Sequence, residues 1–188
     1  MQSEVHEVVA QAQEWLRLDP DNADVLEREI AAALEGDDTA YATLTARFAG
    51  YLTFGTAGLR APLGPGTTRM NRVVVQRAAA GIADFALSHV SDPVVVIGYD
   101  ARHGSQQFAF DSAAVLTAAG CRVHLTETPV PTPVLAFTLQ QRRADVGIMV
   151  TASHNPPTDN GYKVYLGPRL EPSEADTGAY AQITAPTD

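Results

Sequence analysis

Short apolar runs that alternate with longer amphipathic stretches constrain the fold of this chain more than any other feature. Three runs of strand length, rich in β-branched residues, lie at residues 94–99, 122–126 and 146–150. Their nearly continuous hydrophobicity is typical of strands that are covered on both faces. The stretches between the runs have a helical period, which predicts helices at residues 71–88, 105–119 and 132–142. This alternation predicts a three-layer α/β/α sandwich with a mainly parallel mixed sheet.

The first fifty residues have a different, purely helical pattern. Apolar residues recur with a period of about 3.6 in three stretches, and each stretch ends at or near a proline or a glycine. We therefore expect a helical N-terminal extension over residues 1–50 that serves packing only, followed by the α/β/α domain over residues 51–170. Residues 171–188 are rich in Pro, Ala, Thr and Asp, and they are predicted to form a tail or a linker.

Composition and charge narrow the class of protein further. Of 188 residues, 45% are hydrophobic and 19% are charged, which excludes a disordered or collagen-like chain. The net charge is −9, so we expect neither nucleic acid nor an anionic membrane as a partner. An anionic ligand would need local positive charge. No apolar run is long enough to span a bilayer and no leader pattern opens the sequence, so the expected location is cytoplasmic.

The loops that follow the strands are the candidate places for chemistry, because ligands of open α/β sheets gather at the carboxyl ends of the strands. The loop after residues 146–150 places Ser153 and His154 just beyond a buried strand and then returns to Lys163, the single lysine of the chain. An amine can lose its proton and act as a general base, whereas a guanidinium keeps its charge. Spacing alone leaves this interpretation and that of an ordinary solvated turn equally open.

Two other loops carry weaker signals. Residues 53–72 hold four glycines and three arginines, a composition that suits phosphate binding but matches no nucleotide-binding glycine motif. In the second loop Asp100 and Arg102 flank one alanine, and a structural ion pair is at least as good an interpretation as a ligand contact. A serine hydrolase is disfavoured, because G-x-S-x-G is absent and the adjacent Ser153 and His154 are not expected to face each other.

Taken together, the motifs of these three loops resemble those of one protein family. They are T-A-S-H-N-P followed by N-G-Y-K-V-Y, together with F-G-T-A-G-L-R and G-Y-D-A-R. The sequence is similar to the first domain of the α-D-phosphohexomutases, the phosphoglucomutase and phosphomannomutase family, in particular to the subgroup with a helical N-terminal extension. The resemblance covers about residues 10–170, with the motifs in the expected order.

The resemblance implies roles for the matching residues. Ser153 would carry the phosphoryl group that is exchanged with a hexose phosphate, because in this family a phosphoserine donates its phosphoryl group and later takes one back. Lys163 would be the general acid or base for the sugar hydroxyl, and His154 would be an active-site partner. Arg60 would be a charge partner of the phosphoserine.

The resemblance also implies what surrounds the phosphoserine. A seryl phosphate carries close to two negative charges, which call for a divalent cation and arginines. The implied cofactors are Mg²⁺, bound through the phosphate of Ser153, and a hexose 1,6-bisphosphate as activator. Asp100 and Arg102 would support the Ser153 loop.

The sequence departs from the family pattern in two ways. Ala61 follows Arg60 where the family often has glycine, and the chain lacks the D-G-D-x-D-R metal loop, the sugar-selecting G-E-x-S-G loop and the R-x-S-G-T phosphate-binding loop. We therefore expect a phosphohexomutase fragment with an incomplete Mg²⁺ site that is inactive alone and whose preference for glucose or mannose phosphate is not encoded in this stretch. The alternative is a non-catalytic interaction module that docks on a full-length homologue or on separately encoded domains.

Overall fold

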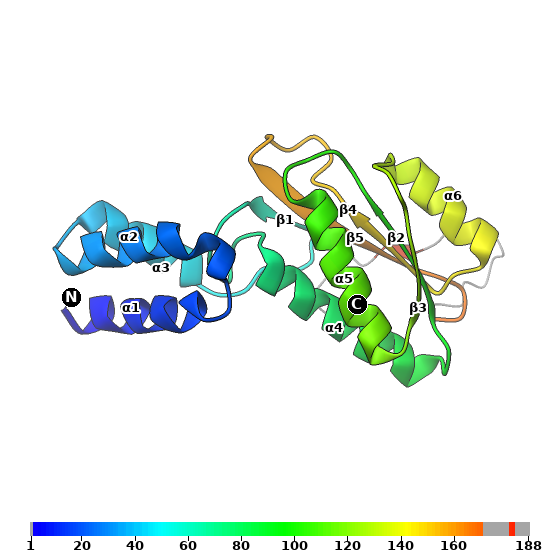
Figure 1. Ribbon diagram of the computed structural model, residues 1–188, viewed down its shortest axis with the longest axis horizontal. Helices are drawn as coiled ribbons and strands as arrows, with labels where there is room; N and C mark the ends of the chain where they lie inside the picture. Colours follow the sequence, from blue (N-terminus) through cyan, green and yellow to red (C-terminus); the bar gives the residue numbers. More distant parts are fainter. Residues whose placement is uncertain (1, 171–180, 183–188) are drawn as a thin grey trace.

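The computed structural model describes residues 2–170 and 181–182 of the chain. An all-helical part lies at one end and an α/β part at the other (Figure 1). The all-helical part comprises α1, η1, α2 and α3, at Gln2–Leu16, Pro20–Asn22, Ala23–Leu34 and Asp38–Phe48. The predicted helical N-terminal extension is thereby confirmed. No helix among the described residues is long and apolar enough to cross a bilayer.

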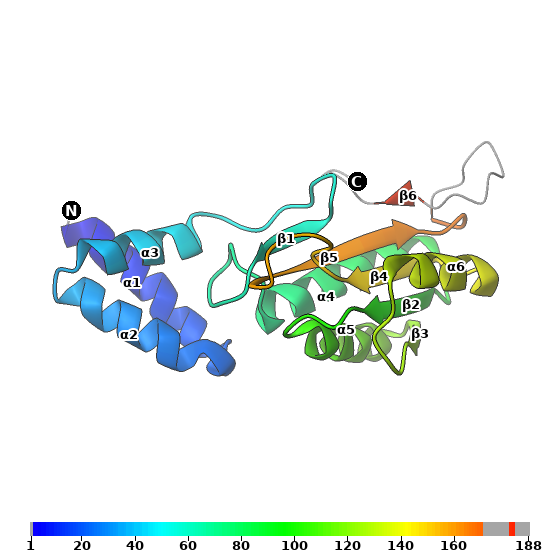
Figure 2. The same ribbon diagram turned by 90° about the horizontal axis from the view of Figure 1, so that it is seen from above.

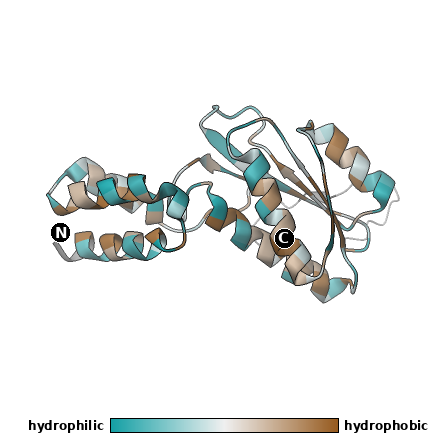
Figure 3. Ribbon diagram, viewed as in Figure 1, coloured by the Kyte–Doolittle hydropathy of each residue, from teal (hydrophilic) through white to brown (hydrophobic). Residues whose placement is uncertain are grey.

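Buried apolar side chains hold the helical extension together. Trp15 of α1, Leu26 of α2 and Leu44 of α3 are almost completely buried, and they share one cluster with Val73 at the start of α4 (Arg72–His89). Hydrophobic and hydrophilic residues alternate along α1 and α2 (Figure 3), as in helices with one buried face. Because Val73 belongs to the same cluster, the helical extension packs directly on the α/β part.

Polar side chains fix where two of the helices begin. The Asp37 carboxylate accepts hydrogen bonds from the backbone N–H groups of Thr39 and Ala40, at 2.8 and 3.1 Å, and so caps α3. The Asn71 side chain accepts the backbone N–H of Val74 at 3.0 Å and caps α4. Each cap satisfies N–H groups that have no partner within the helix, which is typically worth about 1 kcal/mol.

The described strands form one mixed sheet in the order β1-β5-β4-β2-β3, and β6 pairs with β5. Strand β2 is parallel to both β3 and β4, whereas β5 is antiparallel to β4, β1 and β6. The strands are Leu59–Pro62 (β1), Val94–Tyr99 (β2), Arg122–Leu125 (β3), Val146–Val150 (β4), Asp159–Leu166 (β5) and Ala181–Gln182 (β6). The structure confirms the expected mixed sheet.

Helices cover both faces of this sheet (Figure 2). Alternate residues of β2 show the division: Val95 and Ile97 pack with α4 and α5 (Ser105–Ala119), whereas Val96 packs with Leu135 of α6 (Thr132–Arg142). The α4 and α5 side holds the larger core, and the α6 side holds a smaller one. The predicted three-layer α/β/α sandwich is therefore confirmed.

The glycine-rich stretch after residue 51 folds differently from the loop that the sequence predicts. Its residues Leu59–Pro62 form β1, which pairs with the start of β5. Beyond β1, Gly66 lies against α3 with φ +109°, and a Cβ at this position would come within 2.7 Å of the Arg47 carbonyl oxygen. The Thr68 hydroxyl donates to the carbonyl oxygens of Ala46 and Arg47, at 2.7 and 3.0 Å. This stretch therefore attaches the helical extension to the sheet.

The predicted C-terminal tail lies largely outside the described residues. Within residues 171–188 the structure describes only Ala181–Gln182, which pair with Tyr165 and Leu166 of β5. The domain limits of 1–50, 51–170 and 171–188 remain a prediction.

Candidate active site

The loop between β4 and β5 presents Ser153 at the surface. Ser153 has φ +57°, and it is one of two residues other than glycine in the described part of the chain with a left-handed backbone. Its backbone N–H donates to the Thr151 hydroxyl at 2.9 Å, and that hydroxyl donates to Asp100 at 2.6 Å. Thr151 is buried and Ser153 is exposed, so the chain turns outward between them. The hydroxyl of Ser153 is thus on a fixed, solvent-accessible turn.

Arg102 holds the backbone of this loop. Its Nη2 donates to the carbonyl oxygens of Ser153 and Asn155, both at 2.8 Å, and its Nη1 donates to those of Pro156 and Asp159, at 2.7 and 3.1 Å. One guanidinium therefore bonds four carbonyl oxygens within seven residues of chain. It can do so because its donors form a rigid planar fork.

Asp100 orients Arg102 from the end of β2. One carboxylate oxygen lies 3.4 Å from the Arg102 Nε, and the other accepts the Ser105 hydroxyl at 2.7 Å. Asn160 completes this buried network by donating to the Ser105 hydroxyl at 2.9 Å. The side chains of Asp100 and Arg102 are therefore both engaged in hydrogen bonds to other groups of the protein, and both are largely buried.

Arg60 and Lys163 reach the same face of the sheet from two neighbouring strands. Arg60 lies opposite Gly161 in the register of β1 and β5, and Lys163 is two residues further along β5, so the two are diagonal neighbours. Burial and the positive charge of Arg60 lower the pKa of the Lys163 amine from its usual value. No ion pair joins either cation to a carboxylate within the described residues. The face therefore carries two cations and is suited to an anion.

The backbone of Gly58, just before β1, packs closely against Lys163 of β5. Gly58 has φ +83°, and a Cβ there would come within 2.5 Å of the Tyr162 carbonyl oxygen and 3.2 Å of the Lys163 side chain. Only glycine fits both the left-handed backbone and this approach. The motif F-G-T-A-G-L-R thus places its last glycine beside Lys163.

His154 is closer to Ser153 than the sequence analysis expects. Its Nδ1 lies 3.4 Å from the Ser153 Oγ, so the two side chains do face each other. The left-handed backbone of Ser153 turns the chain enough to bring the neighbouring side chains together. Both side chains are exposed.

The other arginines of the glycine-rich stretch do not join this site, contrary to the interpretation of that stretch as one anion-binding loop. Arg72 bonds Asp111 through Nε and Nη2, at 2.6 and 2.9 Å, and Asp21 through Nη1 at 3.1 Å. Arg69 donates to Thr68. Only Arg60 of the three reaches the Ser153 loop, through a hydrogen bond from its Nη1 to Asn155.

Sequence reasoning missed several polar residues of this network, among them Asn155, Ser105 and Asn160. By sequence Asn155 is only a turn former, and the other two are only parts of a helix and a strand. The buried amide of Asn160 donates to the His103 carbonyl at 2.8 Å as well as to Ser105. An asparagine at the start of an apolar strand was the available signal, because a buried amide needs partners.

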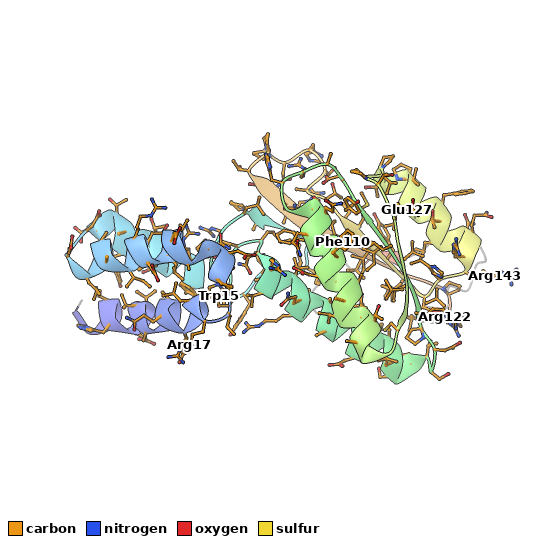
Figure 4. All side chains as sticks on the ribbon, in the orientation of Figure 1. Trp15, Arg17, Phe110, Arg122, Glu127 and Arg143 are labelled. Carbon is orange, nitrogen blue, oxygen red and sulfur yellow. The ribbon has the colours of Figure 1, made fainter. Side chains whose placement is uncertain are left out.

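A cavity elsewhere in the molecule does not contribute to this site. It has a volume of about 330 Å³ and lies between the helical extension and α4, lined among others by Trp15, Phe48, Tyr51 and Arg77. Trp15 occupies the end of α1 nearest α4 (Figure 4), where the Arg77 guanidinium lies 5.3 Å from its ring centre.

Comparison with known proteins gives a consistent family. Residues 51–186 match the model for the phosphoglucomutase/phosphomannomutase α/β/α domain I. A Haemophilus influenzae protein assigned as a phosphomannomutase is 47% identical over 119 residues, which are 63% of this chain and 23% of that protein. The phosphoribomutase of Saccharomyces cerevisiae is 39% identical over 155 residues, 80% of this chain and 24% of that protein.

A solved structure agrees with this assignment. A Thermus thermophilus protein assigned as a phosphomannomutase superposes with a TM-score of 0.57 and 33% identity, over 61% of this chain and 25% of that one. The chain thus spans about a quarter of the length of the relatives that it matches. Because the family model covers well over half of the sequence, the chain belongs to the phosphoglucomutase/phosphomannomutase family and contains its α/β/α domain I.

Proposed function

We propose that this chain carries the phosphoserine of a sugar-phosphate mutase, and that Ser153 is the residue that accepts and returns the phosphoryl group. The observation that carries the proposal is the position of Ser153: its exposed hydroxyl lies on a turn that Arg102 holds, and Arg60, which has no carboxylate partner among the described residues, bonds Asn155 of the same loop. Lys163 is the diagonal neighbour of Arg60 on the sheet. A phosphoserine adds close to two negative charges, which such cations stabilise. Arg60 is the proposed charge partner of that phosphate.

The proton transfers can be assigned to the neighbouring side chains. When the Ser153 Oγ attacks a phosphate of a hexose 1,6-bisphosphate, an Oγ–P bond forms and the bond between phosphorus and the sugar oxygen breaks. His154, in its neutral form, accepts the hydroxyl proton, because its Nδ1 faces the Oγ at 3.4 Å. Lys163 protonates the departing sugar oxygen. In the reverse direction its amine, whose pKa is lowered, takes the proton of the sugar hydroxyl.

The part of the chain that the structure describes does not build a magnesium site. It contains no cluster of three His, Cys, Asp or Glu side chains that could hold a metal ion. The two carboxylates next to the loop are engaged elsewhere: Asp100 with Thr151 and Ser105, and Asp159 with Asn155. Mg²⁺ is therefore proposed to bind only through the phosphate of a phosphorylated Ser153, and none of the proposed proton transfers depends on it.

Intact mass measurement tests the proposal. The purified chain is incubated with glucose 1,6-bisphosphate, and the mass of the protein is measured before and after. We expect the wild type to gain one phosphoryl group and Ser153→Ala to gain none. Ser88→Ala, which removes another exposed serine hydroxyl on α4, should behave like the wild type. An adduct that persists in Ser153→Ala, or a wild type that gains no mass, would refute the proposal.

A pentose phosphate is a second candidate substrate. Two relatives that align over 82% and 80% of this chain are named as phosphoribomutases, the first as a probable one, from Schizosaccharomyces pombe and Saccharomyces cerevisiae. The relative named for a hexose phosphate that is cited above aligns over a shorter part. Ribose 1,5-bisphosphate as a second phosphoryl donor separates the two: faster labelling of Ser153 by the ribose compound would favour the pentose.

The interaction module remains an alternative, and it is compatible with a phosphoserine. Large apolar side chains are exposed on α5 and α6: Phe110 is 51% exposed (Figure 4), and Val134 and Phe137 are 42% and 62% exposed. Such side chains can form contacts with further domains of a mutase or with a homologue. Size-exclusion chromatography with a full-length relative tests this, and no co-elution at micromolar concentration would contradict it. The proposed location is the cytoplasm.

A further inference from the structure

Asn155 joins the only arginine of β1 to the Ser153 loop. Its Oδ1 accepts a hydrogen bond from the Arg60 Nη1 at 3.1 Å, while its Nδ2 donates to the Asp159 Oδ2 at 3.0 Å. Its backbone is held at both ends, because its N–H donates to Ala152 at 3.0 Å and its carbonyl accepts from Arg102 at 2.8 Å. The amide is therefore fixed in place between a cation and a carboxylate.

The Arg60 guanidinium has an unused donor. Its Nε is buried and has no hydrogen-bond partner among the described residues. Among the described residues, the one side-chain hydrogen bond of Arg60 is to the neutral oxygen of Asn155. A carboxylate at position 155 would bind the same guanidinium more strongly, but it would also cancel its charge.

We propose that Asn155 is a positioning residue that orients Arg60 toward the phosphorylated Ser153 while leaving the charge of Arg60 unneutralised. The inference rests on the proposed function of Ser153. The Asn155 amide lies between Arg60 and the carboxylate of Asp159, because it accepts from the first and donates to the second. Lys163 is the other cation on this face. The neutral amide thus fixes the geometry of Arg60, and the two cations supply the field.

An exchange of the side chains at positions 155 and 159 separates the effect of a negative charge next to Arg60 from the effect of side-chain shape at position 155. In the double variant Asn155→Asp with Asp159→Asn, the amide at 159 can donate to the carboxylate at 155, so net charge and hydrogen bonding are retained. The negative charge moves next to Arg60. We expect the rate of phosphoryl uptake at Ser153 to fall about tenfold or more, because catalysis by positioned charge is lost when that charge is neutralised. An unchanged rate in the folded double variant would overturn the proposal.

Two measurements without phosphoryl transfer distinguish this inference from the proposed function. NMR relaxation of the Arg60 Nε–H reports whether the side chain is held, and titration with inorganic phosphate reports whether its charge is available. Asn155→Ala should make Arg60 mobile, and the exchanged variant should keep it ordered but bind phosphate about tenfold more weakly. An Arg60 that stays ordered in Asn155→Ala, or a wild-type Arg60 signal that phosphate does not shift, would overturn the proposal.

The controls address two other causes of a changed Arg60: the removal of an asparagine in general, and misfolding of the variant. Asn22→Ala removes another asparagine whose amide donates to an aspartate, Asp19, in the helical extension, and it should leave Arg60 unchanged. If the exchanged variant does not fold, Asn155→Ala alone decides the orienting role. If the wild type takes up no phosphoryl group, the proposed function fails while the relaxation and titration still test Asn155.

Discussion

Replacement of Arg102 by alanine would test how the Ser153 loop is held. Arg102 makes four hydrogen bonds to carbonyl oxygens of the loop. Hydrogen bonds with a charged partner contribute about 1.5–3 kcal/mol each, but the freed carbonyls on an exposed loop can bond water, and bonds that share one side chain are not additive. We therefore expect a loss of about 3 kcal/mol, concentrated in the loop, which is far below the sum over four bonds.

Hydrogen exchange measures this loss where it should occur. The backbone N–H groups of Asn155 and Asp159 are bonded within the loop, to Ala152 and Pro156, at 3.0 Å each. A local loss of about 3 kcal/mol corresponds to roughly a hundredfold faster exchange of these amides. Arg102→Lys should recover only part of it, since an ammonium cannot span four carbonyl oxygens in a planar fork.

A matched arginine provides the control for Arg102. Arg122 has a side chain that is 63% exposed, and among the described residues it makes one ion pair, with Asp92 at 3.2 Å. Exposed pairs of this kind contribute about 0–1 kcal/mol, so Arg122→Ala should leave the loop amides unaffected. If exchange of Asn155 and Asp159 in Arg102→Ala stays within about threefold of the wild type, the assigned role of Arg102 is wrong.

Three further changes are expected to act in defined directions. The pKa of Lys163 is lowered in the folded chain, so between that pKa and the ordinary value of 10.5 the unfolded chain binds more protons. The free energy of unfolding should therefore rise with pH across this range. Urea unfolding at several pH values should show this rise for the wild type and not for Lys163→Met. Asp145→Asn should lower the urea unfolding free energy by about 2–3 kcal/mol, because this fully buried carboxylate pairs with Arg169 at 2.7 Å; a loss below about 0.5 kcal/mol would contradict this. Gly66→Ala should cost about 2–4 kcal/mol by the same measurement, since φ is +109° and the new Cβ would meet Arg47; unchanged stability would show that the loop can move away.

Local patterns in the sequence were sufficient for most elements. The expected helices at residues 105–119 and 132–142 and the expected strands at 94–99 and 146–150 have the bounds found in the structure. Each is long enough, and uniform enough in period, to be fixed by its own residues. The helix expected from residue 71 begins one residue later, because Asn71 caps it with its side chain.

Elements that depend on distant partners could not be predicted in this way. Strand β1 has four residues between glycine-rich turns, and it exists because β5, about a hundred residues further on, offers an edge to pair with. The same limit applies to the arginines near it. Arg60, Arg69 and Arg72 are equivalent by composition, but only the fold directs Arg60 to the Ser153 loop and Arg72 to Asp111. Serine, histidine and lysine in one loop and its return were recognisable because they are near in sequence.

A chain with a net charge of −9 can still present an anion site, because the charges near Ser153 are not evenly distributed. The carboxylate of Asp100 is occupied by Arg102, Thr151 and Ser105, and that of Asp159 by Asn155. Arg60 and Lys163 form no ion pair with a carboxylate among the described residues, so their charges are available to an anion although the whole molecule is acidic. Screening acts over about 8 Å at physiological salt, which leaves the remote acids little influence on a bound phosphate. Phosphate affinity at this face should therefore depend on Arg60 and Lys163 far more than on the total charge, and neutralising surface acids of the helical extension should leave it unchanged.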